Sequence, residues 1–374
     1  MAVIVLGGGL MGAASAFFLA QRGVQVTLVD RRRIGAGATV ASFGNIRRSG
    51  RHLSQLALAR RSLDLWNQAE TLLGRDVEFR ASGHLRLIFD AESLADMRKF
   101  AEAARPFGLD LDELGPGEIH RRFPGLGPSA IAASFSPEDG SANPRLVAPA
   151  FAAAAAAKGA MIVDSAPVSQ IRRNTHGFTV ETARGNFEAE ILLNCAGGWG
   201  TTIAAQFGEP VPLNTFGPQM GVTEPLPHRI LPVVGVWSRD HGAYFRQVER
   251  GNIVFGGAVE RVPVDPDPGF AQVDPARLPV QLGALSRLLP AIRDVSVIRQ
   301  WSGCEGYVED SLPVVGASST TPGLFHAFGF CGHGFQLGPG VGATMAELIA
   351  TGRTEIELEP FSPGRFAQKN TTSQ

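Results

Sequence analysis

Residues 2–30 read AVIVLGGGLMGAASAFFLAQRGVQVTLVD, and this stretch decides the class of fold. Its first five residues, Ala2–Leu6, form a short, continuous apolar run of the kind that is buried in a parallel sheet. A glycine turn follows and opens a helix of small residues, which ends near Gly23. A second apolar strand over residues 24–29 ends at Asp30. This succession of strand, turn, helix and strand predicts the start of an α/β protein.

The glycines of this turn leave room for the phosphates of a dinucleotide. Gly7 permits the tight turn, Gly9 lets the backbone approach a pyrophosphate, and Gly12 lets the helix pack closely on the strand. Asp30 can accept hydrogen bonds from ribose hydroxyls and would repel a 2′-phosphate, which disfavours an NADP-type ligand and leaves FAD and NAD. The alternative, a glycine turn that binds no dinucleotide, is disfavoured by the flanking strands, helix and acid.

Composition and charge exclude several other classes of protein. The 374 residues allow two domains or one large α/β unit, and their net charge of -1 does not favour nucleic acid or anionic lipid as a partner. The three cysteines are widely separated, which predicts neither a disulfide framework nor a metal site. Because no apolar run is long enough to span a bilayer and no basic segment precedes the N-terminal strand, we expect a cytoplasmic protein that binds a small molecule.

Hydrophobic periodicity and turn residues predict the other elements. Residues 31–51 are rich in Gly, Ser, Asn and Arg, which is typical of a loop over an anionic group such as a flavin pyrophosphate. The pattern also predicts a helix over 53–73 capped by Gly74, and two strands over 77–80 and 84–89 joined by a turn. Further helices are expected over 91–104, 144–158 and 275–289, and further strands over 161–163, 169–172, 178–181, 191–194 and 252–257 and near Tyr244.

A second glycine-rich turn lies near the C-terminus. Residues 329–336 read GFCGHGFQ and precede a helix that we expect from about residue 341 to 350, with Gly352 just past its end. A glycine turn at a helix N-terminus directs unpaired N–H groups and the positive end of the helix dipole at an anion. In a flavoprotein that anion is the charge that builds at N1 and O2 on reduction, so this turn favours FAD over NAD. The alternative is a capped terminal helix with no ligand.

Five motifs, in this order, resemble those of the D-amino-acid-oxidase-like FAD superfamily, and specifically its sarcosine oxidase, glycine oxidase and D-hydroxyproline or opine oxidase branch. They are GGGLMG with Asp30, ALARRSLDLW (57–66), NCAGGW (194–199), RQWSGCEGYVEDSLPVVG (299–316) and GFCGHGFQLGPGVG (329–342). The resemblance implies a glutathione-reductase-like FAD-binding Rossmann domain over 1–82, 142–212 and 312–374. It implies an inserted mixed-sheet α+β substrate domain over 83–141 and 213–311.

The resemblance also implies the residues that contact the cofactor. Gly7, Gly9, Gly12 and Asp30 would hold the adenosine diphosphate half, with Val168 near the adenine. The phosphate and ring region would be lined by Thr39, Ser42, Asn45 and Gly197, and the pyrimidine edge by Gly334, Phe335 and Gln336. The remaining contacts expected on this basis are Leu10, Met11, Arg31, Gly37, Ala196, Trp199, Gly332 and His333.

The chain departs from these relatives where they bind the substrate carboxylate. The lysine that follows the GHGF turn in sarcosine oxidases is Gln336 here, and the arginine of glycine oxidases is matched by Glu305. We therefore expect a guanidinium group to take this role, because arginine binds a carboxylate with two parallel hydrogen bonds. The candidates are Arg47, Arg48, Arg51 and Arg246, of which Arg48 and Arg47 are favoured; the alternative for each is a surface or pyrophosphate contact.

Several further residues have a family role to match. Tyr244 resembles the active-site tyrosine of glycine oxidases, and otherwise would be a core aromatic. The position of the cysteine that binds FAD covalently in some members is Gly303, so we expect non-covalent FAD and a buried free thiol at Cys304. No lysine matches the one that promotes reaction with oxygen in sarcosine oxidases. His326 and His333 are the candidates for supplying positive charge there, although a lone histidine is more often a structural residue.

The sequence therefore predicts FAD-dependent oxidation of the C–N bond in a small secondary or D-amino acid, by hydride transfer to flavin N5 and hydrolysis of the resulting imine. Candidate substrates are an N-substituted glycine, iminodiacetate, a D-proline type and an opine; Arg48, Tyr244 and His333 are the candidate catalytic residues. The electron acceptor is O2 or a partner subunit of a hetero-oligomeric dehydrogenase. The alternatives are a non-catalytic FAD-binding subunit and NAD-dependent hydride transfer.

Overall fold

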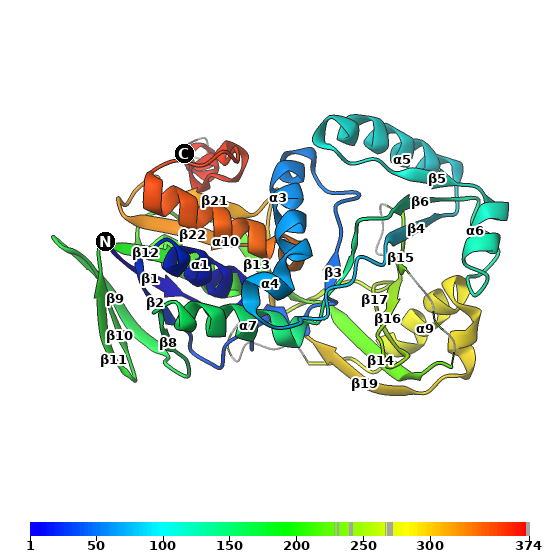
Figure 1. Ribbon diagram of the computed structural model, residues 1–374, viewed down its shortest axis with the longest axis horizontal. Coiled ribbons are helices and arrows are strands. Elements are labelled where there is room, and N and C mark those ends of the chain that lie inside the picture. Colours follow the sequence, from blue (N-terminus) through cyan, green and yellow to red (C-terminus); the bar gives the residue numbers. More distant parts are fainter. Residues whose placement is uncertain (228, 230–231, 239–241, 266, 268–271, 372–374) are drawn as a thin grey trace.

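The computed structural model describes residues 1–227, 229, 232–238, 242–265, 267 and 272–371. Two layered units lie side by side: a six-stranded sheet covered by helices, and an eight-stranded sheet with its own helices (Figure 1). The predicted α/β fold, with a parallel Rossmann-type sheet and a second mixed sheet, is confirmed.

The six-stranded sheet has the strand order β21-β22-β12-β1-β2-β8. Its strands are parallel with the exception of β21, which pairs antiparallel with β22. The bounds of these strands are β1 (Ala2–Leu6), β2 (Gln25–Val29), β8 (Met161–Val163), β12 (Ile191–Asn194), β21 (Val314–Ala317) and β22 (Leu324–Phe328). The sheet therefore combines distant parts of the chain, because β12 lies between the N-terminal strand β1 and the C-terminal strand β22.

The central strand β1 is apolar on both faces because both faces are covered. Val3 and Val5 belong to the core formed with the helices, whereas Ile4 and Leu6 belong to a second core on the opposite face. That second core is closed by a three-stranded antiparallel sheet of β9 (Val168–Asn174), β10 (Gly177–Thr182) and β11 (Gly185–Ala189). Continuous apolarity in residues 2–6 thus follows from period-two alternation between two buried faces.

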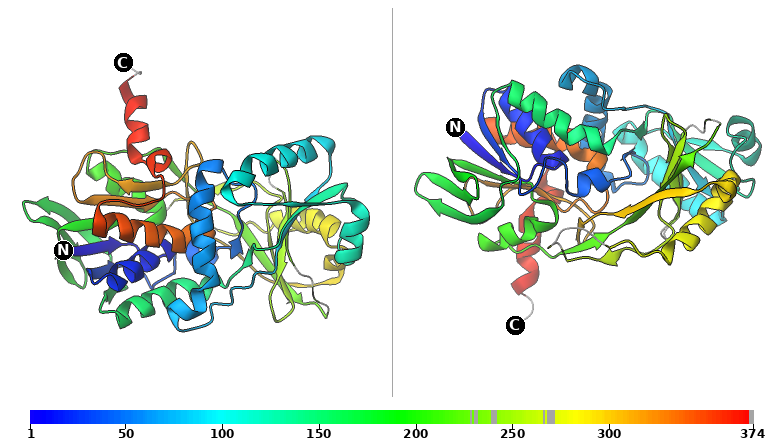
Figure 2. Two further views of the ribbon diagram at one scale, coloured as in Figure 1. Left: turned by 45° about the horizontal axis from the view of Figure 1, so that its top comes forward. Right: turned by 90° about the horizontal axis from the view of Figure 1, so that it is seen from below.

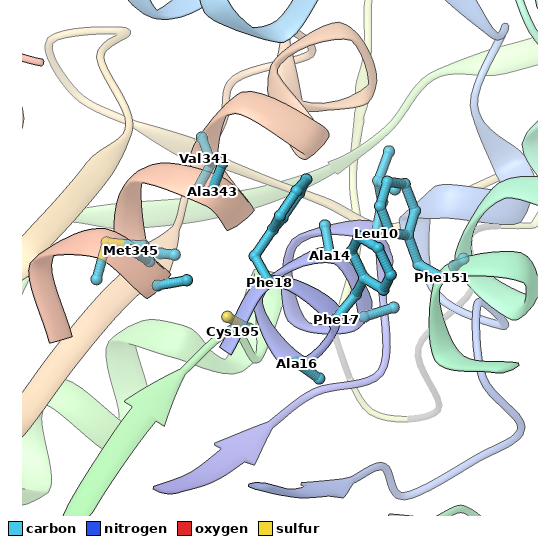
Figure 3. Packing of buried hydrophobic residues seen from close by; sticks show 14 of the residues in the cluster. Leu10, Ala14, Ala16, Phe17, Phe18, Phe151, Cys195, Val341, Ala343 and Met345 are labelled. Atoms are coloured by element: carbon cyan, nitrogen blue, oxygen red, sulfur yellow. The ribbon is translucent and has the colours of Figure 1, made fainter. Parts of the chain in front are cut away.

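Three helices form the layer over the other face: α1 (Leu10–Gln21), α7 (Pro144–Ala157) and α10 (Gly334–Thr351). Phe17 and Phe18 of α1 pack against Phe151 of α7, and the Val341 to Met345 segment of α10 approaches α1 from the other side (Figure 3). Glycines on α10 permit this close approach, since a Cβ on Gly342 would lie 2.6 Å from the Cβ of Ala14. Small residues at helical spacing therefore set the distance between α1 and α10.

The eight-stranded sheet has the order β19-β14-β17-β16-β15-β4-β6-β5. Its strands are β4 (His84–Ile88), β5 (Asp112–Leu114), β6 (Ala132–Ser136), β14 (Gln219–Pro225), β15 (Val233–Val236), β16 (Tyr244–Gln247), β17 (Asn252–Gly256) and β19 (Val297–Ser302). One face packs on α6 (Pro116–Arg122) and α9 (Arg277–Leu288) through a core that includes Leu85 and Phe245. The other face turns toward the six-stranded unit (Figure 2).

Smaller elements connect and cover these layers. Two small sheets pair β3 (Asn45–Ile46) with β7 (Gly140–Ser141), and β13 (Leu213–Gly217) with β18 (Val262–Pro263) and β20 (Glu305–Val308). The other helices are α2 (Ala38–Ala41), α3 (Leu56–Asn67), α4 (Ala69–Leu73), α5 (Ala91–Ala104) and α8 (Gly200–Gln206). The short 3-10 helices are η1 (Leu53–Gln55), η2 (Arg105–Phe107), η3 (Gly197–Trp199), η4 (Pro290–Asp294), η5 (Glu359–Phe361) and η6 (Pro363–Thr371).

Three expectations from the sequence are wrong. Residues 77–80 form no strand but one isolated bridge from Arg80 to Ser141, and β4 instead pairs with β6 and β15. The helix expected over 53–73 is three pieces, although Gly74 does cap the last one in a left-handed conformation. Helix α10 begins at Gly334, seven residues before the expected start, because packing on α1 and α3 accommodates its glycines and Pro339.

The strands of the two large sheets come from the segments of the chain that were expected to form the two domains. Every strand of the six-stranded sheet lies within 1–82, 142–212 or 312–374, and every strand of the eight-stranded sheet lies within 83–141 or 213–311. The pair β3–β7 joins the two sets. The domain boundaries themselves stay a prediction.

Candidate active site

A first cavity of about 410 Å³ lies at the carboxyl ends of the parallel strands. It is bordered by Gly7 after β1, Asp30 after β2, Ala196 after β12 and Gly329 after β22. Gly7 has a φ of 102°, and a Cβ there would overlap the carbonyl oxygen of Cys195. Only glycine fits this turn, which brings backbone N–H groups to the cavity wall.

The N-terminus of α1 opens into this cavity. Gly9 precedes the helix and provides no side-chain cap, and Leu10 N–H donates to Thr39 Oγ1 at 2.9 Å. Gly9, Leu10 and Met11 border the cavity, so the positive end of the helix dipole is directed at it. The arrangement suits an anionic group such as a pyrophosphate.

Asp30 lies at the edge of the same cavity and is held by backbone amides. Its two oxygens accept hydrogen bonds of 2.6 Å from Gly8 N–H and from Arg32 N–H. Burial raises the pKa of Asp30, while these hydrogen bonds and the neighbouring arginines oppose that rise. Each carboxylate oxygen keeps a second acceptor site, so the side chain can still accept from a ligand hydroxyl.

A second cavity of about 380 Å³ adjoins the first. Its walls come from residues 42–51, the inner face of the eight-stranded sheet and the turn before α10. Five residues border both cavities: Ser42, Glu305, Cys331, Gly332 and Phe335. A ligand in the first cavity therefore meets a ligand in the second at the turn that precedes α10.

The second cavity is cationic. Arg47, Arg51 and Arg86 border it, and among the described residues no carboxylate lies within ion-pair distance of any of the three. Burial lowers the pKa of Arg51 and Arg86 well below the ordinary value, and the charge of Arg47 lowers both further. Arginine nevertheless stays protonated at neutral pH. The cavity therefore favours a ligand that brings negative charge.

Comparison with known proteins identifies the family of this chain. The family model described as "FAD dependent oxidoreductase", known as DAO, matches residues 2–348. The chain belongs to this family. As a DAO-family protein it is an FAD-dependent oxidoreductase of the amino-acid oxidase or dehydrogenase type.

Three relatives cover nearly the whole chain. Glycine oxidase of Geobacillus kaustophilus is 29% identical over 98% of this chain and 97% of its own, and a subunit of the opine oxidase of Rhizobium meliloti is 28% identical over 97% and 96%. The crystal structure of L-proline dehydrogenase from P. horikoshii has a TM-score of 0.92 and 29% identity, and covers 98% of both chains. Mouse dimethylglycine dehydrogenase is 27% identical to this chain and is the longer protein. The match covers 99% of this chain but 44% of the dehydrogenase.

The first cavity of this DAO-family protein fits FAD. Sixteen of the predicted cofactor contacts border it: Gly7, Gly9, Leu10, Met11, Asp30, Arg31, Gly37, Thr39, Ser42, Val168, Ala196, Gly197, Trp199, Gly332, Gly334 and Phe335. Gly12 lies under the turn, where a Cβ would overlap the carbonyl oxygen of Gly7. Asn45, His333 and Gln336 border the second cavity instead. The cofactor contacts themselves stay predictions.

Two of the arginines that the sequence offered as ligands of the substrate carboxylate, Arg48 and Arg246, do not line either cavity. Arg48 forms ion pairs with Glu138 and with the fully buried Asp139, whose Oδ1 lies 3.4 Å from Arg48 Nε. Arg246 donates through Nε to the carbonyl of Phe43 at 2.7 Å, and its guanidinium carbon lies 5.6 Å from the centre of the Phe43 ring. Neither residue is in the lining of the cavities, which argues against the substrate role expected of them. Arg47 and Arg51, in contrast, face the second cavity.

Arg48 should therefore matter for stability and not for catalysis. We expect Arg48→Met to lower the free energy of unfolding by about 3–5 kcal/mol, because it leaves Asp139 buried without its cationic partner. Arg60 pairs with the same Glu138 at the surface, so Arg60→Met should change stability by less than about 1 kcal/mol. Chemical denaturation of both variants measures the difference. A loss of turnover by folded Arg48→Met, at unchanged stability, would restore the original assignment.

The environments of the other predicted catalytic groups shift their pKa values. Burial lowers the pKa of His333 well below its ordinary value and the nearby arginines lower it further, which disfavours a positive charge on this imidazole. Burial raises the pKa of Tyr244, whose ring packs edge-on against Phe43 at 4.8 Å in the cavity wall. His326 lies elsewhere, fully buried between Asn194 and Glu209.

Glu305 lies at the junction of the two cavities. Its carboxylate accepts a hydrogen bond of 2.8 Å from the Tyr307 hydroxyl, and the guanidinium of Arg261 stacks 4.1 Å from the Tyr307 ring. Burial raises the pKa of Glu305, while Tyr307 and Arg261 oppose that rise. Among the described residues of the second cavity this is the one carboxylate, so it complements the arginines there.

Arg86 is a residue of the second cavity that was not among the candidates from the sequence. It lies on β4, where Leu85 and Leu87 face the core and the alternate residues His84 and Arg86 face the second cavity. Its guanidinium stacks 4.1 Å from the Trp237 ring and donates to the Val236 carbonyl. The detectable signal was a basic residue at every second position of an otherwise apolar strand.

Proposed function

We propose that the protein oxidises the C–N bond of a small secondary or D-amino acid bound in the second cavity, with FAD in the first. One observation carries the proposal: a cationic cavity adjoins the cofactor cavity at the turn before α10. The names of its relatives include glycine, L-proline and opine, which are small amino acids or their N-substituted derivatives. When bound, FAD supplies the acceptor for the hydride that leaves the substrate carbon.

The arginines would bind and orient the substrate. Arg51 and Arg47 would hold its carboxylate, since arginine forms paired charge-assisted hydrogen bonds with that group. Holding the reacting carbon in one position accounts for much of the rate enhancement that such sites provide. Water would hydrolyse the resulting imine to an oxo acid and an amine.

Glu305 would take the proton of the substrate ammonium. The amine must be neutral to lose hydride, and Glu305 is a half-buried carboxylate at the junction of the cavities. Burial stabilises its protonated form and raises its pKa, while Tyr307 and Arg261 stabilise its ionised form. A carboxylate with a raised pKa is suited to accept and hold a proton near neutral pH.

The raised pKa of Glu305 predicts a pH-dependent stability. A carboxyl whose folded pKa exceeds its unfolded value contributes fully to stability below the unfolded pKa, and that contribution is lost as the pH rises through the folded pKa. Glu305→Gln lacks this term. We expect the variant to gain stability relative to wild type as pH increases from about 4 to 8, at equal FAD content. Thermal unfolding at several pH values measures the difference; a constant or opposite difference contradicts it.

FAD would be held without a covalent bond. At Gly303, which matches the cysteine used for attachment in some relatives, a Cβ would lie 2.7 Å from the Cβ of Ala41. Under this proposal the cofactor domain comprises 1–82, 142–212 and 312–374, and the substrate domain comprises 83–141 and 213–311.

The test is to purify the protein, record its visible spectrum and extract the flavin. Secondary and D-amino acids are then added under anaerobic conditions, and bleaching of the flavin absorbance is followed. We expect bleaching by at least one small amino acid. Bound flavin that no amine bleaches would contradict the proposal and favour a non-catalytic FAD-binding subunit, whereas a colourless protein that cannot take up FAD would contradict cofactor and chemistry together.

A dehydrogenase subunit that passes electrons to a partner is the second candidate, because one relative is named as an oxidase subunit and another as a dehydrogenase. With a substrate identified, peroxide production is compared with reduction of an artificial dye. Peroxide formed in proportion to substrate indicates an oxidase. Rapid dye reduction with negligible peroxide indicates the subunit of a dehydrogenase.

A further inference from the structure

The number of arginines in the second cavity exceeds what one carboxylate requires. A single bidentate guanidinium satisfies one carboxylate, yet Arg47, Arg51 and Arg86 all border the cavity. Arg261 also borders it, but its charge acts on Glu305 and Tyr307. Three like charges held together are unfavourable unless a ligand supplies negative charge.

Among the described residues, each of the three guanidinium groups is anchored by neutral hydrogen-bond partners, and the one carboxylate whose charge acts on Arg47 and Arg51, that of Asp139, lies beyond ion-pair distance of both. Arg51 donates to the Arg47 carbonyl at 2.6 Å, to Gln55 Oε1 at 3.4 Å and to the His333 carbonyl at 3.4 Å. Arg47 donates to the Ser49 carbonyl, and Arg86 donates to the Val236 carbonyl at 3.2 Å while stacking on Trp237. The groups are therefore positioned before any ligand binds.

The three groups are arranged as a row with Arg47 in the middle. A Cβ on Gly50 would overlap Arg86 Nη1 and would lie 3.2 Å from Arg47 Nη1, so these two guanidinium groups converge at Gly50. The charge of Arg47 acts on both Arg51 and Arg86. The Arg51 guanidinium in turn donates to the backbone carbonyls of Arg47 and of His333, and His333 lies in the turn before α10. The row thus offers two anion positions, one at Arg51 beside the cofactor cavity and one at Arg86 on β4.

Unpartnered polar atoms lie along the same wall. Within the described residues, buried side-chain atoms with no hydrogen-bond partner include His84 Nδ1, Asn45 Oδ1, His333 Nδ1 and Gln336 Oε1, and all four residues border this cavity. His84 is 3% exposed and Gln336 is 1% exposed. Buried polar groups are normally paired. Because Asn45, His333 and Gln336 are also predicted FAD contacts, the atom among these four that indicates a polar ligand at the β4 end of the cavity is His84 Nδ1, two residues from Arg86.

We propose that the substrate is a dicarboxylic amino acid, whose α-carboxylate binds at Arg51 and Arg47 and whose second carboxylate binds at Arg86. This inference rests on the proposed function and narrows it. It separates dicarboxylic secondary amines, in which both nitrogen substituents carry a carboxylate, from monocarboxylic amino acids such as proline or sarcosine. The second carboxylate neutralises the positive charge that remains in the cavity after the α-carboxylate has bound.

The first test measures binding without turnover. Purified FAD-loaded protein is titrated with straight-chain dicarboxylates from succinate to pimelate and with the monocarboxylate of the same chain length, and the change in the flavin visible spectrum gives each Kd. We expect the best dicarboxylate to bind at least about 100-fold more tightly than its monocarboxylate partner. A ratio below about 3 for every pair overturns the proposal.

Variants then locate the second carboxylate. Arg86→Met should reduce the ratio to near unity by weakening the dicarboxylate, with the Kd of the monocarboxylate changed by less than about 3-fold. Arg86→Lys should retain part of the preference, because it keeps the charge but not the planar fork. Arg98→Met, which removes an exposed ion pair with Glu113, is the matched control and should keep the full ratio. An unchanged ratio in folded Arg86→Met, with wild-type flavin content, overturns the assignment.

A substrate pair separates this inference from the function on which it rests. Iminodiacetate and N-ethylglycine differ in one terminal group, a carboxylate in the first and a methyl in the second. We expect faster anaerobic flavin bleaching by the dicarboxylate. Bleaching by both at equal kcat/KM overturns the dicarboxylic preference and keeps the oxidase function. Tight dicarboxylate binding with no bleaching by any amine keeps the anion site and overturns the oxidase function.

Discussion

Replacing Arg51 by methionine is expected to lower kcat/KM for the substrate by about 100- to 1,000-fold. Arg51 is 5% exposed and borders the second cavity beside the turn before α10. Removing one member of a desolvated charge pair costs about 2–5 kcal/mol, because the carboxylate of the substrate is left without its partner. Rapid-mixing measurements of flavin reduction at several substrate concentrations provide the ratio.

Two controls define what the Arg51 result means. Arg51→Lys keeps the charge without the two parallel hydrogen bonds and should lose less activity than Arg51→Met. Arg60→Met changes an exposed arginine of α3 and should leave kcat/KM within about 3-fold. If Arg51→Met keeps wild-type kcat/KM while its flavin content and melting temperature are normal, the carboxylate binds elsewhere in the row, and Arg47→Met becomes the decisive variant.

Replacing Gly9 by valine is expected to raise the Kd for FAD at least about 100-fold while the apo protein keeps its fold. The backbone of Gly9 has φ -68° and ψ -175°, which any residue can adopt, and a Cβ would lie 3.4 Å from Thr39 Oγ1 in ordinary contact. The side chain would therefore extend into the first cavity, at the helix N-terminus where we place the pyrophosphate. A 100-fold change corresponds to about 2.7 kcal/mol of binding free energy.

Gly9→Val is measured by FAD titration of apo protein and by thermal unfolding of that apo protein. Gly12→Ala should differ, because its Cβ would overlap the Gly7 carbonyl and destabilise the apo protein itself. Gly117→Ala on α6, where a Cβ meets no atom within 4 Å, is the control and should change neither quantity. Wild-type FAD affinity in Gly9→Val would exclude the pyrophosphate from this helix N-terminus.

Local sequence patterns predicted the bounds of a helix or strand correctly where the segment itself has a clear hydrophobic pattern. The bounds of β1, β12 and α5 are those expected, because apolar runs and helical spacing report burial directly. Residues 77–80 alternate apolar and charged residues as a half-buried strand does, but they form only the single bridge from Arg80 to Ser141, since β6 and β15 occupy both edges of β4. Pairing is non-local, so a pattern within one segment does not reveal it.

The sequence by itself determined the α/β class and the family, and it predicted which glycine turn binds FAD, because each of the motifs involved consists of residues close together in the chain. It also indicated that a cluster of arginines between residues 47 and 51 would face an anion. Only the tertiary structure decided which of them do so: Arg48 points to Asp139, whereas Arg47 and Arg51 meet Arg86 from a strand some 35 residues away. The direction of a long side chain depends on the buried charges around it, and those are brought together by folding.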